Sequence, residues 1–368
     1  MPAKSFIKSR IRSVIQPANV ISILFLAIIA GLLFVFSRNS AVQTPAGGAA
    51  QEAGTGTIEV FFSAPDDPAS RTQRGGPDAD LAASIRSARR SVDIAAYNLD
   101  LWSVRDALLE AFDAGVTVRF VVEDSHLEEA EVQDLITRGI EVVADSDEAL
   151  MHHKFVIVDQ WDVWTGSMNF TLNGAYRNDN NLLHLRSGSV AKNFEREFEE
   201  MFLEGRFGRL SRRDTPFPRL DLESAQVETY FSPDDDPLVG LLEALQTAET
   251  QVLVMAYTLT QDALTEILIE QSRNGLDVRV LMEAGQISST GNDFIQLKEG
   301  GVDARTDRNP YNMHHKVIIL DERTVITGSY NFTRSAEERN DENLLIIKDE
   351  DLAAAYLVEF SRIWEAAQ

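Results

Sequence analysis

Short apolar runs alternate with longer amphipathic segments along most of this chain of 368 residues. The runs are rich in Val, Ile, Leu and Phe and have the length of strands, whereas the segments between them have helical spacing. Alternation of strand, helix and strand predicts βαβ units, and hence an α/β fold with a parallel or mixed sheet covered by helices. The first runs are IEVFF from residue 58, SVDIAA from residue 91 and VTVRFVV from residue 116.

The segment between the second and third runs predicts a helix. Leu108, Leu109 and Phe112 supply an apolar stripe, and Gly115 stands where a helix commonly ends. The stretch 103–106, Ser-Val-Arg-Asp, has the pattern of a capping box, so we expect the helix to begin there.

The whole pattern then occurs a second time. From the MHHK stretches onward the two copies keep a constant offset of 162 residues. Such self-similarity indicates an internal duplication with two homologous lobes, at 58–206 and 227–368, joined by a connector at 207–226. The matched pairs include IEVFFSAPDD and VETYFSPDDD, SVDIAAYNLD and QVLVMAYTLT, MHHKFVIVD and MHHKVIILD, TGSMNFT and TGSYNFT, and RNDNNLLHL and RNDENLLII.

The N-terminus differs from the rest. Residues 20–36 form an uncharged apolar run after a basic stretch at 1–19, and Ala, Gly, Ser and Thr dominate 37–57. We interpret 20–36 as a transmembrane signal anchor and 37–57 as a flexible linker, with the lobes on the extracytoplasmic side. A cleaved signal peptide is the alternative, and it would give a secreted protein.

Composition narrows the possible functions. The chain has no Cys, which excludes disulfides and thiolate metal sites. Its net charge is -24, and residues 1–40 contribute only positive charges, so the acidic excess lies in the rest of the chain. Such a charge opposes binding to nucleic acids at long range, although a local cationic site remains compatible with it.

The two MHHK stretches each place a histidine and a lysine on one face of a strand. Residues i and i+2 of a strand share a face, so His152 lies beside Lys154 while His153 points away. Ser167 and Asn169 share a face in the same way, and these groups together suit phosphate oxygens. The second lobe repeats the set as His314, Lys316, Ser329 and Asn331.

Two other interpretations explain less. A repeated buried strand accounts for the apolar runs but not for a lysine on the face of each histidine. A metal site is disfavoured because adjacent histidines face apart and a lysine repels a cation. We therefore expect no metal and no cofactor, and we assign His153 and His315 to structural roles.

The pattern H-x-K-x4-D followed by G-S-x-N resembles the phospholipase D superfamily, and the resemblance covers residues 58–368. It implies two α-β-α lobes related by a pseudo-twofold axis, with both motifs in one site. One histidine would form a covalent phosphohistidine and the other would protonate the leaving oxygen. With the histidines, the motif residues Lys154, Lys316, Asp159 and Asp321 and the nearby Glu342 would make up the catalytic set. The phosphate-binding set would be Lys154, Lys316, Ser167, Asn169, Ser329 and Asn331.

One difference between the lobes bears on the roles of the histidines. Glu342 falls where the family often places an acid that hydrogen-bonds its own lobe's histidine, and the matching residue of the first lobe is Asn180. Since a carboxylate raises the pKa of a histidine, we expect His314 to be the general acid and His152 the nucleophile. The reverse assignment stays open, because a carboxylate can also assist a nucleophile.

The resemblance implies a phosphodiester substrate, and the identity of the groups esterified to its phosphate stays open. Because of the anchor, we expect a phospholipase D or head-group transferase acting on glycerophospholipids at a membrane surface, with a cardiolipin-synthase-like transfer as one form. An endonuclease of the same superfamily is the alternative. Both motifs are intact, which argues against an inactive binding module. Since one chain holds both motifs, we expect a monomer.

Overall fold

The computed structural model describes residues 56–145 and 148–367. The expected anchor at 20–36 and nearly all of the expected linker therefore lie outside the described residues. Among the residues that are described, no helix combines the length and apolarity needed to cross a membrane.

The first lobe is built on a mixed seven-stranded sheet with the order β1-β7-β6-β5-β2-β3-β4. Strands β2, β3 and β4 are parallel, and the remaining neighbours are antiparallel. Its strands are β1 (Thr57–Phe62), β2 (Ser91–Ala96), β3 (Thr117–Val122), β4 (Glu141–Ala144), β5 (Lys154–Val158), β6 (Asp162–Gly166) and β7 (Asn181–Arg186). Its helices are α2 (Pro77–Ser87), α3 (Trp102–Asp113), α4 (Ala130–Arg138), α5 (Leu172–Tyr176) and α6 (Gly188–Phe202), with short 3-10 turns η1 (Pro68–Thr72) and η2 (Asp124–His126).

The second lobe repeats this plan on an eight-stranded sheet with the order β12-β11-β10-β13-β14-β15-β9-β8. The added edge strand β8 comes from the segment that the sequence assigns to the connector. Its strands are β8 (Arg219–Asp221), β9 (Gln226–Ser232), β10 (Gln251–Ala256), β11 (Asp277–Met282), β12 (Asp303–Thr306), β13 (Lys316–Leu320), β14 (Thr324–Gly328) and β15 (Glu342–Lys348). Its helices are α7 (Pro237–Gln246), α8 (Asp262–Arg273), α9 (Phe294–Gly300), α10 (Arg334–Glu338) and α11 (Glu350–Ala366), with 3-10 turns η3 (Gly208–Leu210) and η4 (Ala284–Gln286).

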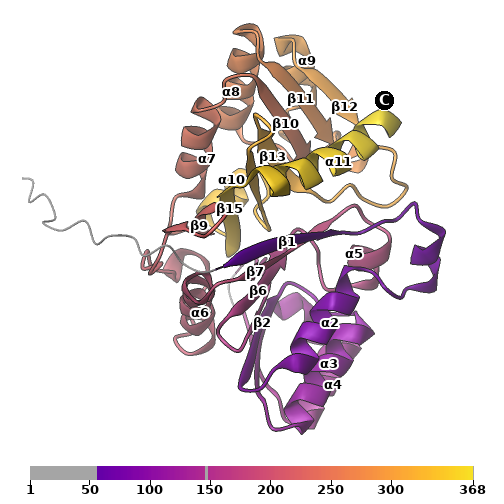
Figure 1. Ribbon diagram of the computed structural model, residues 1–368, viewed down its shortest axis with the longest axis vertical. Helices are drawn as coiled ribbons and strands as arrows, with labels where there is room; N and C mark the ends of the chain where they lie inside the picture. Colours follow the sequence, from indigo (N-terminus) through magenta and orange to yellow (C-terminus); the bar gives the residue numbers. More distant parts are fainter. Residues whose placement is uncertain (1–55, 146–147, 368) are drawn as a thin grey trace, which may run out of the picture. The chain divides into compact units, whose positions relative to one another are not determined.

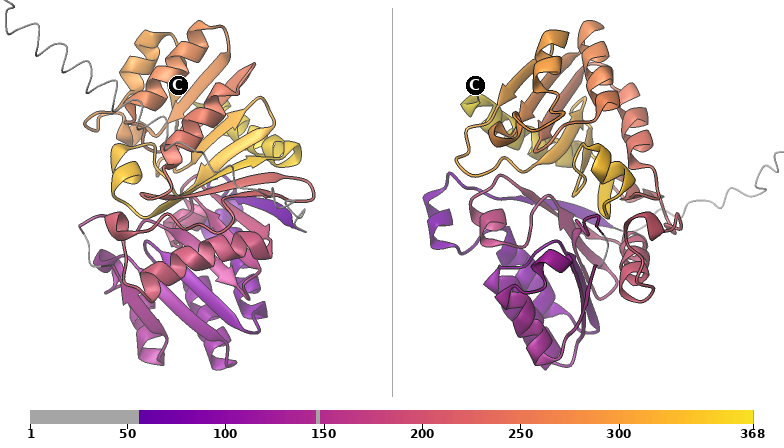
Figure 2. Two further views of the ribbon diagram at one scale, coloured as in Figure 1. Left: turned by 90° about the vertical axis from the view of Figure 1, so that its left-hand side faces the viewer. Right: turned by 180° about the vertical axis from the view of Figure 1, so that it is seen from behind.

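The colours of the ribbon separate into an indigo-to-magenta lobe and an orange-to-yellow lobe, as the duplication predicts (Figure 2). The βαβ prediction is confirmed at β2–α3–β3, whose strands are parallel. The predicted capping box is wrong: α3 begins at Trp102, and the Ser103 hydroxyl donates to Asp78 Oδ2 at 2.6 Å. Because Asp78 lies on α2, the Ser103 hydroxyl makes a tertiary contact between two helices instead of capping the N-terminus of α3, as the local pattern predicts.

Three apolar clusters hold the molecule together. Helices α2, α3 and α4 lie together on one lobe and cover its own core (Figure 1), and α7, α8 and α9 do the same on the other. The third cluster joins the lobes, because it combines residues of both sheets with the buried faces of α6 and α11. Phe155, Phe194 and Phe231 show this, since their rings pack edge to face across the boundary. The site between the lobes thus rests on a continuous core.

Backbone pairing also crosses between the lobes. Met151 forms a parallel bridge with Asp341, and Asp179 forms one with Met313. The segment before each MHHK histidine is therefore hydrogen-bonded to the segment before β15 or β7 of the opposite lobe. This crossed pairing sets the geometry of the site.

Candidate active site

The two motif histidines are buried and each is held by a residue of the other lobe. His152 Nδ1 lies 2.8 Å from Glu342 Oε2, and His314 Nδ1 lies 2.9 Å from Asn180 Oδ1 and 3.0 Å from the Ser167 carbonyl oxygen. Since these partners accept hydrogen bonds, each Nδ1 carries the proton and each Nε2 is left with its lone pair.

The expectation that Glu342 serves His314 is wrong, because this acid contacts His152. The cause is the crossed pairing: the His152 N–H donates to the Asp341 carbonyl at 3.0 Å, which brings the next residue, Glu342, against His152. The His314 N–H donates to the Asp179 carbonyl in the same way and so meets Asn180. The premise of the acid and nucleophile assignment is therefore overturned.

The two motif serines hydrogen-bond Asn180 and Glu342, the residues that hold the histidines. Ser167 donates to Asn180 Oδ1 at 2.9 Å and accepts the Asn181 N–H at 3.0 Å. Ser329 accepts the Asn343 N–H at 3.0 Å, and its hydroxyl hydrogen-bonds Glu342. Both serines have no exposed surface. The expected phosphate-binding role is thus replaced by a positioning role, since a buried hydroxyl with filled partners has no donor to offer a substrate.

The two motif lysines supply the positive charge of the site. Lys154 and Lys316 are buried, and their Nζ atoms donate to the carbonyls of His152 and His314 at 2.6 and 2.9 Å. Burial lowers the pKa of Lys154 to about 7, and burial together with Lys154 lowers the pKa of Lys316 well below its ordinary value. An anionic phosphate would stabilise the charged form of both amines.

We expect oxyanion binding to weaken as the pH rises above about 7, by up to about tenfold per pH unit, because Lys154 then loses its proton. The measurement is the inhibition constant of tungstate, whose charge is constant over this range, at a series of pH values. Lys154→Met should bind weakly at every pH, whereas Lys192→Met, at an exposed site on α6, should match the wild type. Inhibition by tungstate that does not change with pH in the wild type would contradict this role.

The motif asparagines are available for a ligand. Asn169 and Asn331 are half-buried, and their amide N–H groups are the donors that phosphate oxygens could use, whereas their Oδ1 atoms are buried acceptors without a hydrogen-bond partner. The rings of Tyr97 and Tyr257 stand edge-on to His152 and His314 at 5.1 and 4.6 Å between centroids. These four side chains complete a site with the same parts in both halves.

The second histidine of each pair turns away from the site, as the sequence predicts. His153 Nε2 lies 2.9 Å from Glu197 Oε1, and His315 Nε2 lies 3.0 Å from Glu359 Oε1. Both imidazoles have no exposed surface. They anchor the strand to α6 or α11 and thereby fix the direction of the neighbouring motif histidine.

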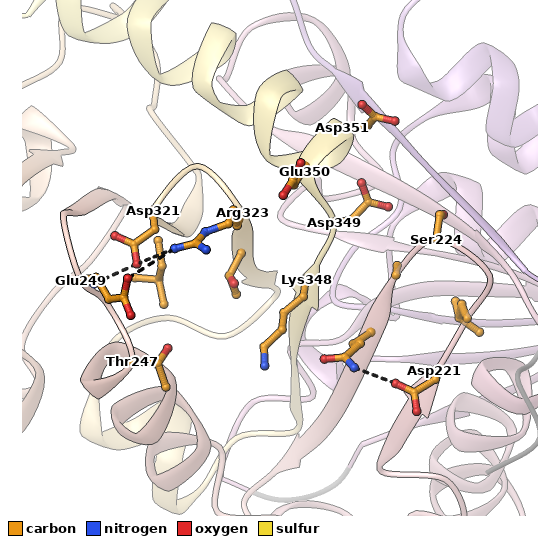
Figure 3. A pocket seen from close by; sticks show the side chains of 15 residues that line it. Asp221, Ser224, Thr247, Glu249, Asp321, Arg323, Lys348, Asp349, Glu350 and Asp351 are labelled. Atoms are coloured by element: carbon orange, nitrogen blue, oxygen red, sulfur yellow. Dashed lines mark hydrogen bonds and ion pairs between the residues drawn. The ribbon is translucent and has the colours of Figure 1, made fainter. Parts of the chain in front are cut away.

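Asp159 and Asp321 are not part of this site. Each follows the far end of its strand, seven residues from His152 or His314, or about 23 Å along an extended chain. The Asp159 carboxylate accepts the N–H groups of Arg90 and Ser91 at 2.7 and 3.1 Å, and Asp321 holds the matching loop at 249–251. Figure 3 shows Asp321 at a pocket of about 790 Å³ at that end, with Arg323 paired to both Asp321 and Glu249. Their catalytic assignment is therefore corrected to a structural one.

Asp159→Ala should destabilise the fold by about 1–3 kcal/mol, because it leaves the N–H groups before β2 without their acceptor. Activity per folded molecule should not change. The backbone N–H bonds lower the pKa of Asp159, although burial opposes them, so its contribution should be present near neutral pH and lost in acid. Urea unfolding at neutral and acidic pH measures both effects, and Asp321→Ala should behave alike. A loss of kcat at full folding would return Asp159 to the catalytic set.

Sequence reasoning missed the asparagines that follow Asn180 and Glu342. Asn343 Oδ1 accepts the Thr165 hydroxyl at 3.2 Å, and Asn181 Oδ1 accepts the Thr327 hydroxyl at the same distance. Each bond joins the two lobes beneath the histidines. The repetition of this Asn in RNDNNLL and RNDENLL is the signal that could have found it.

Within residues 56–145 and 148–367, no group of three or more His, Asp or Glu side chains is arranged to hold a metal ion. Hydrogen-bond donors of the described site are amines, amides and imidazoles. Two imidazoles in one site suit a reaction in which one attacks phosphorus and the other protonates the leaving oxygen.

The comparisons with known proteins agree with this chemistry. The family model described as "Cardiolipin synthase, PLD-like domain" matches residues 81–202 and 241–364, one stretch in each lobe. A protein of Rickettsia prowazekii named phospholipase D is 34% identical over 143 residues, which are 39% of this chain and 70% of that protein. A human protein named mitochondrial cardiolipin hydrolase is 34% identical over 131 residues, 36% of this chain and 52% of that protein.

A solved structure extends the likeness to both lobes. Phosphatidylserine synthase of Haemophilus influenzae aligns with a TM-score of 0.60 over 84% of this chain and 87% of that one. Its identity is 13%, so this likeness concerns the fold alone. The family match covers most of both lobes and the motifs lie together in one site. The chain therefore belongs to the phospholipase D superfamily and is a phosphodiesterase of that family.

Proposed function

We propose that this protein hydrolyses or exchanges the head group of glycerophospholipids through a covalent phosphohistidine. The observation that carries the proposal is the pair of buried imidazoles, each with a free Nε2 and each beside a buried lysine. The names of the family model and of the relatives favour a lipid substrate. The expected anchor would hold the lobes near a membrane, on the extracytoplasmic side.

In the first step, His152 Nε2 attacks phosphorus and the bond from phosphorus to the leaving oxygen breaks. His314 gives its Nε2 proton to that oxygen. Burial, with the lysines nearby, lowers the pKa of both histidines, so both are neutral in the empty site. The anionic substrate offsets the lysine charges and allows His314 to take up its proton on binding.

In the second step, His314 removes a proton from water or an alcohol, whose oxygen attacks phosphorus and breaks the bond to His152. Lys154, Lys316, Asn169 and Asn331 would hold the non-bridging oxygens throughout. We assign the nucleophile to His152 because the Glu342 carboxylate can stabilise the cationic imidazole that attack on phosphorus creates. The same effect of a carboxylate left the reverse assignment open as long as Glu342 was expected beside His314.

The test uses the purified lobes, from residue 45 onward, in EDTA, with phospholipid vesicles and fluorescent single-stranded DNA offered in parallel. Release of head groups that is lost in His152→Ala and in His314→Ala would support the lipid substrate. Cleavage of DNA with untouched vesicles would replace it with the nuclease alternative. Product analysis with added glycerol separates hydrolysis from transfer, and light scattering of the same sample tests the expected monomer.

A further inference from the structure

The two halves of the boundary between the lobes carry opposite charges at one equivalent position. On α11, Arg362 pairs with three carboxylates, with Nη2 2.8 Å from Glu359 Oε1 and 2.5 Å from Asp179 Oδ1, and Nη1 2.9 Å from Asp66 Oδ2. Glu359 is the acid that binds His315. An arginine thus neutralises the acids behind the His314 half of the site.

In the other half, 162 residues earlier, the position of Arg362 is occupied by Glu200. The rest of the arrangement is kept, since Glu197 binds His153 and Asp341 stands where Asp179 stands. Glu197, Glu200 and Asp341 are 5%, 1% and 0% exposed, so all three lie away from water. We call these three residues the acid cluster.

The acid cluster lacks the positive charge that its counterpart has. Glu200 Oε1 and Asp341 Oδ2 have no hydrogen-bond partner. Arg196 is the nearby guanidinium, 3.9 Å from Glu200 Oε2, but it already pairs with Glu204 and Asp214 at 3.0 and 2.8 Å. The other charged or titratable groups that face the cluster are His153, Asp145, Arg206, Asp234 and Asp235.

Buried carboxyls without a counter-charge keep their protons. Burial and the neighbouring acids raise the pKa of Glu197 and of Asp341 well above the ordinary range, and burial raises that of Glu200 to about 7. Glu359 shows the opposite result: Arg362 and His315 outweigh its burial and lower its pKa to about 2. Two equivalent acids therefore differ in charge near neutral pH.

The acid cluster is connected directly to His152. The backbone of Asp341 pairs on both sides of Met151, accepting from the His152 N–H at 3.0 Å and donating to the Leu150 carbonyl at 2.9 Å. The next residue along the chain, Glu342, holds the His152 ring. The Asp341 side chain is tied to the connector through the Gly208 N–H at 2.7 Å. A displacement of Asp341 would therefore move His152.

We propose that Glu197, Glu200 and Asp341 are positioning residues that hold the His152 half of the site while they are protonated, and that alkaline pH loosens this half. When the protons leave, three negative charges without a matching cation repel one another at the lobe boundary. The His314 half keeps its geometry because Arg362 stays charged. The inference rests on the phosphodiesterase site and is independent of which phosphodiester is the substrate.

The direction of the pH effect follows from the raised pKa values. A carboxyl that binds its proton more tightly in the folded state stabilises the fold most in acid. This contribution falls as the pH rises from the unfolded pKa, about 4.5 for Glu and about 3.8 for Asp, through the folded pKa. For Glu200 the fall ends near its folded pKa of about 7, and Glu197 and Asp341, whose pKa values are also raised by burial, contribute in the same direction.

The test is thermal unfolding of the full chain in EDTA between about pH 5 and about pH 9, for the wild type and Glu200→Gln. Glu200→Gln should match the wild type in acid and melt at least about 2 °C higher in alkali. Glu199→Gln removes the same charge from a partly exposed site on the same helix and serves as the matched control. Identical melting of all three proteins at every pH would overturn the proposal.

A second readout separates positioning from stability alone. With bis(p-nitrophenyl) phosphate as probe, kcat of the wild type should fall between about pH 7 and about pH 9, and Glu200→Gln should keep a larger fraction, with the same KM as the wild type at each pH. A stabilised Glu200→Gln with the wild-type pH profile of kcat would overturn the positioning role. Stabilisation of the wild type, but not of Glu200→Gln, by Ca²⁺ would show that a metal ion and not a proton fills the cluster. Neither result depends on lipid hydrolysis.

Discussion

Replacing His152 by alanine should lower kcat on a phospholipid by about 10⁴-fold or more, because no other described group supplies a free imidazole nitrogen beside Glu342. His314→Ala should lower kcat by about 10²–10⁴-fold, the range for loss of a general acid. Both variants should fold, because the apolar core between the lobes is untouched. Melting curves recorded alongside the assays check this point.

A substrate with an activated leaving group distinguishes the roles of the two histidines. p-Nitrophenolate leaves without a proton, so His314→Ala should still form the phosphoenzyme from bis(p-nitrophenyl) phosphate and then stall, since it lacks the base for the second step. Rapid mixing should show a burst of about one p-nitrophenolate per enzyme in His314→Ala and no burst in His152→Ala.

Mass spectrometry of the trapped His314→Ala protein should locate the phosphoryl group on His152. A burst in His152→Ala, with the label on His314, would reverse the assignment. A wild type that turns over without any labelled histidine would remove the covalent intermediate altogether.

Glu342→Ala should lower kcat by about 10²-fold, the cost typical of losing a group that orients a catalytic histidine. The expected defect lies in attack by His152, because Glu342 Oε2 holds Nδ1 of that ring at 2.8 Å. An activated leaving group should therefore not rescue this variant, and the rate of the burst should fall. Glu342→Gln should recover part of the rate, because its amide oxygen still accepts the Nδ1 proton.

Asn180→Ala is the matched variant in the other half. Asn180 holds His314, so its removal should impair proton donation to the leaving oxygen. Bis(p-nitrophenyl) phosphate should rescue the burst of Asn180→Ala and leave that of Glu342→Ala slow. Equal rescue of both variants would show that the crossed contacts do not divide the two steps in this way.

The pattern of the sequence was sufficient for the architecture. Strand and helix periodicity within each lobe predicts the βαβ units, and the constant offset between the MHHK stretches predicts two equivalent halves. The motifs place a histidine and a lysine on one face of each strand, and the structure finds both lysines buried beside the histidines. These features are local, because they depend on neighbours two to four residues apart.

Contacts between the halves could not be predicted from those neighbours. Glu342 and His152 are 190 residues apart, and only the bridge between Met151 and Asp341 brings them together. Membership in a motif also did not guarantee a place in the site. Asp159 belongs to the H-x-K-x4-D pattern, yet the five residues of β5 separate it from the His152 end of that strand.

By itself, the sequence determined the duplicated α/β plan, the motif residues and the family, because repeated spacing and periodicity act over short stretches of chain. The tertiary structure alone decided which lobe's residue holds each histidine and that the serines position those residues instead of binding phosphate. It also decided that Glu200 lies among other acids, whereas Arg362 at the equivalent position neutralises them. The physical reason is that hydrogen bonds and buried charges depend on which distant segments pair, and that pairing is set by the packing of the two sheets.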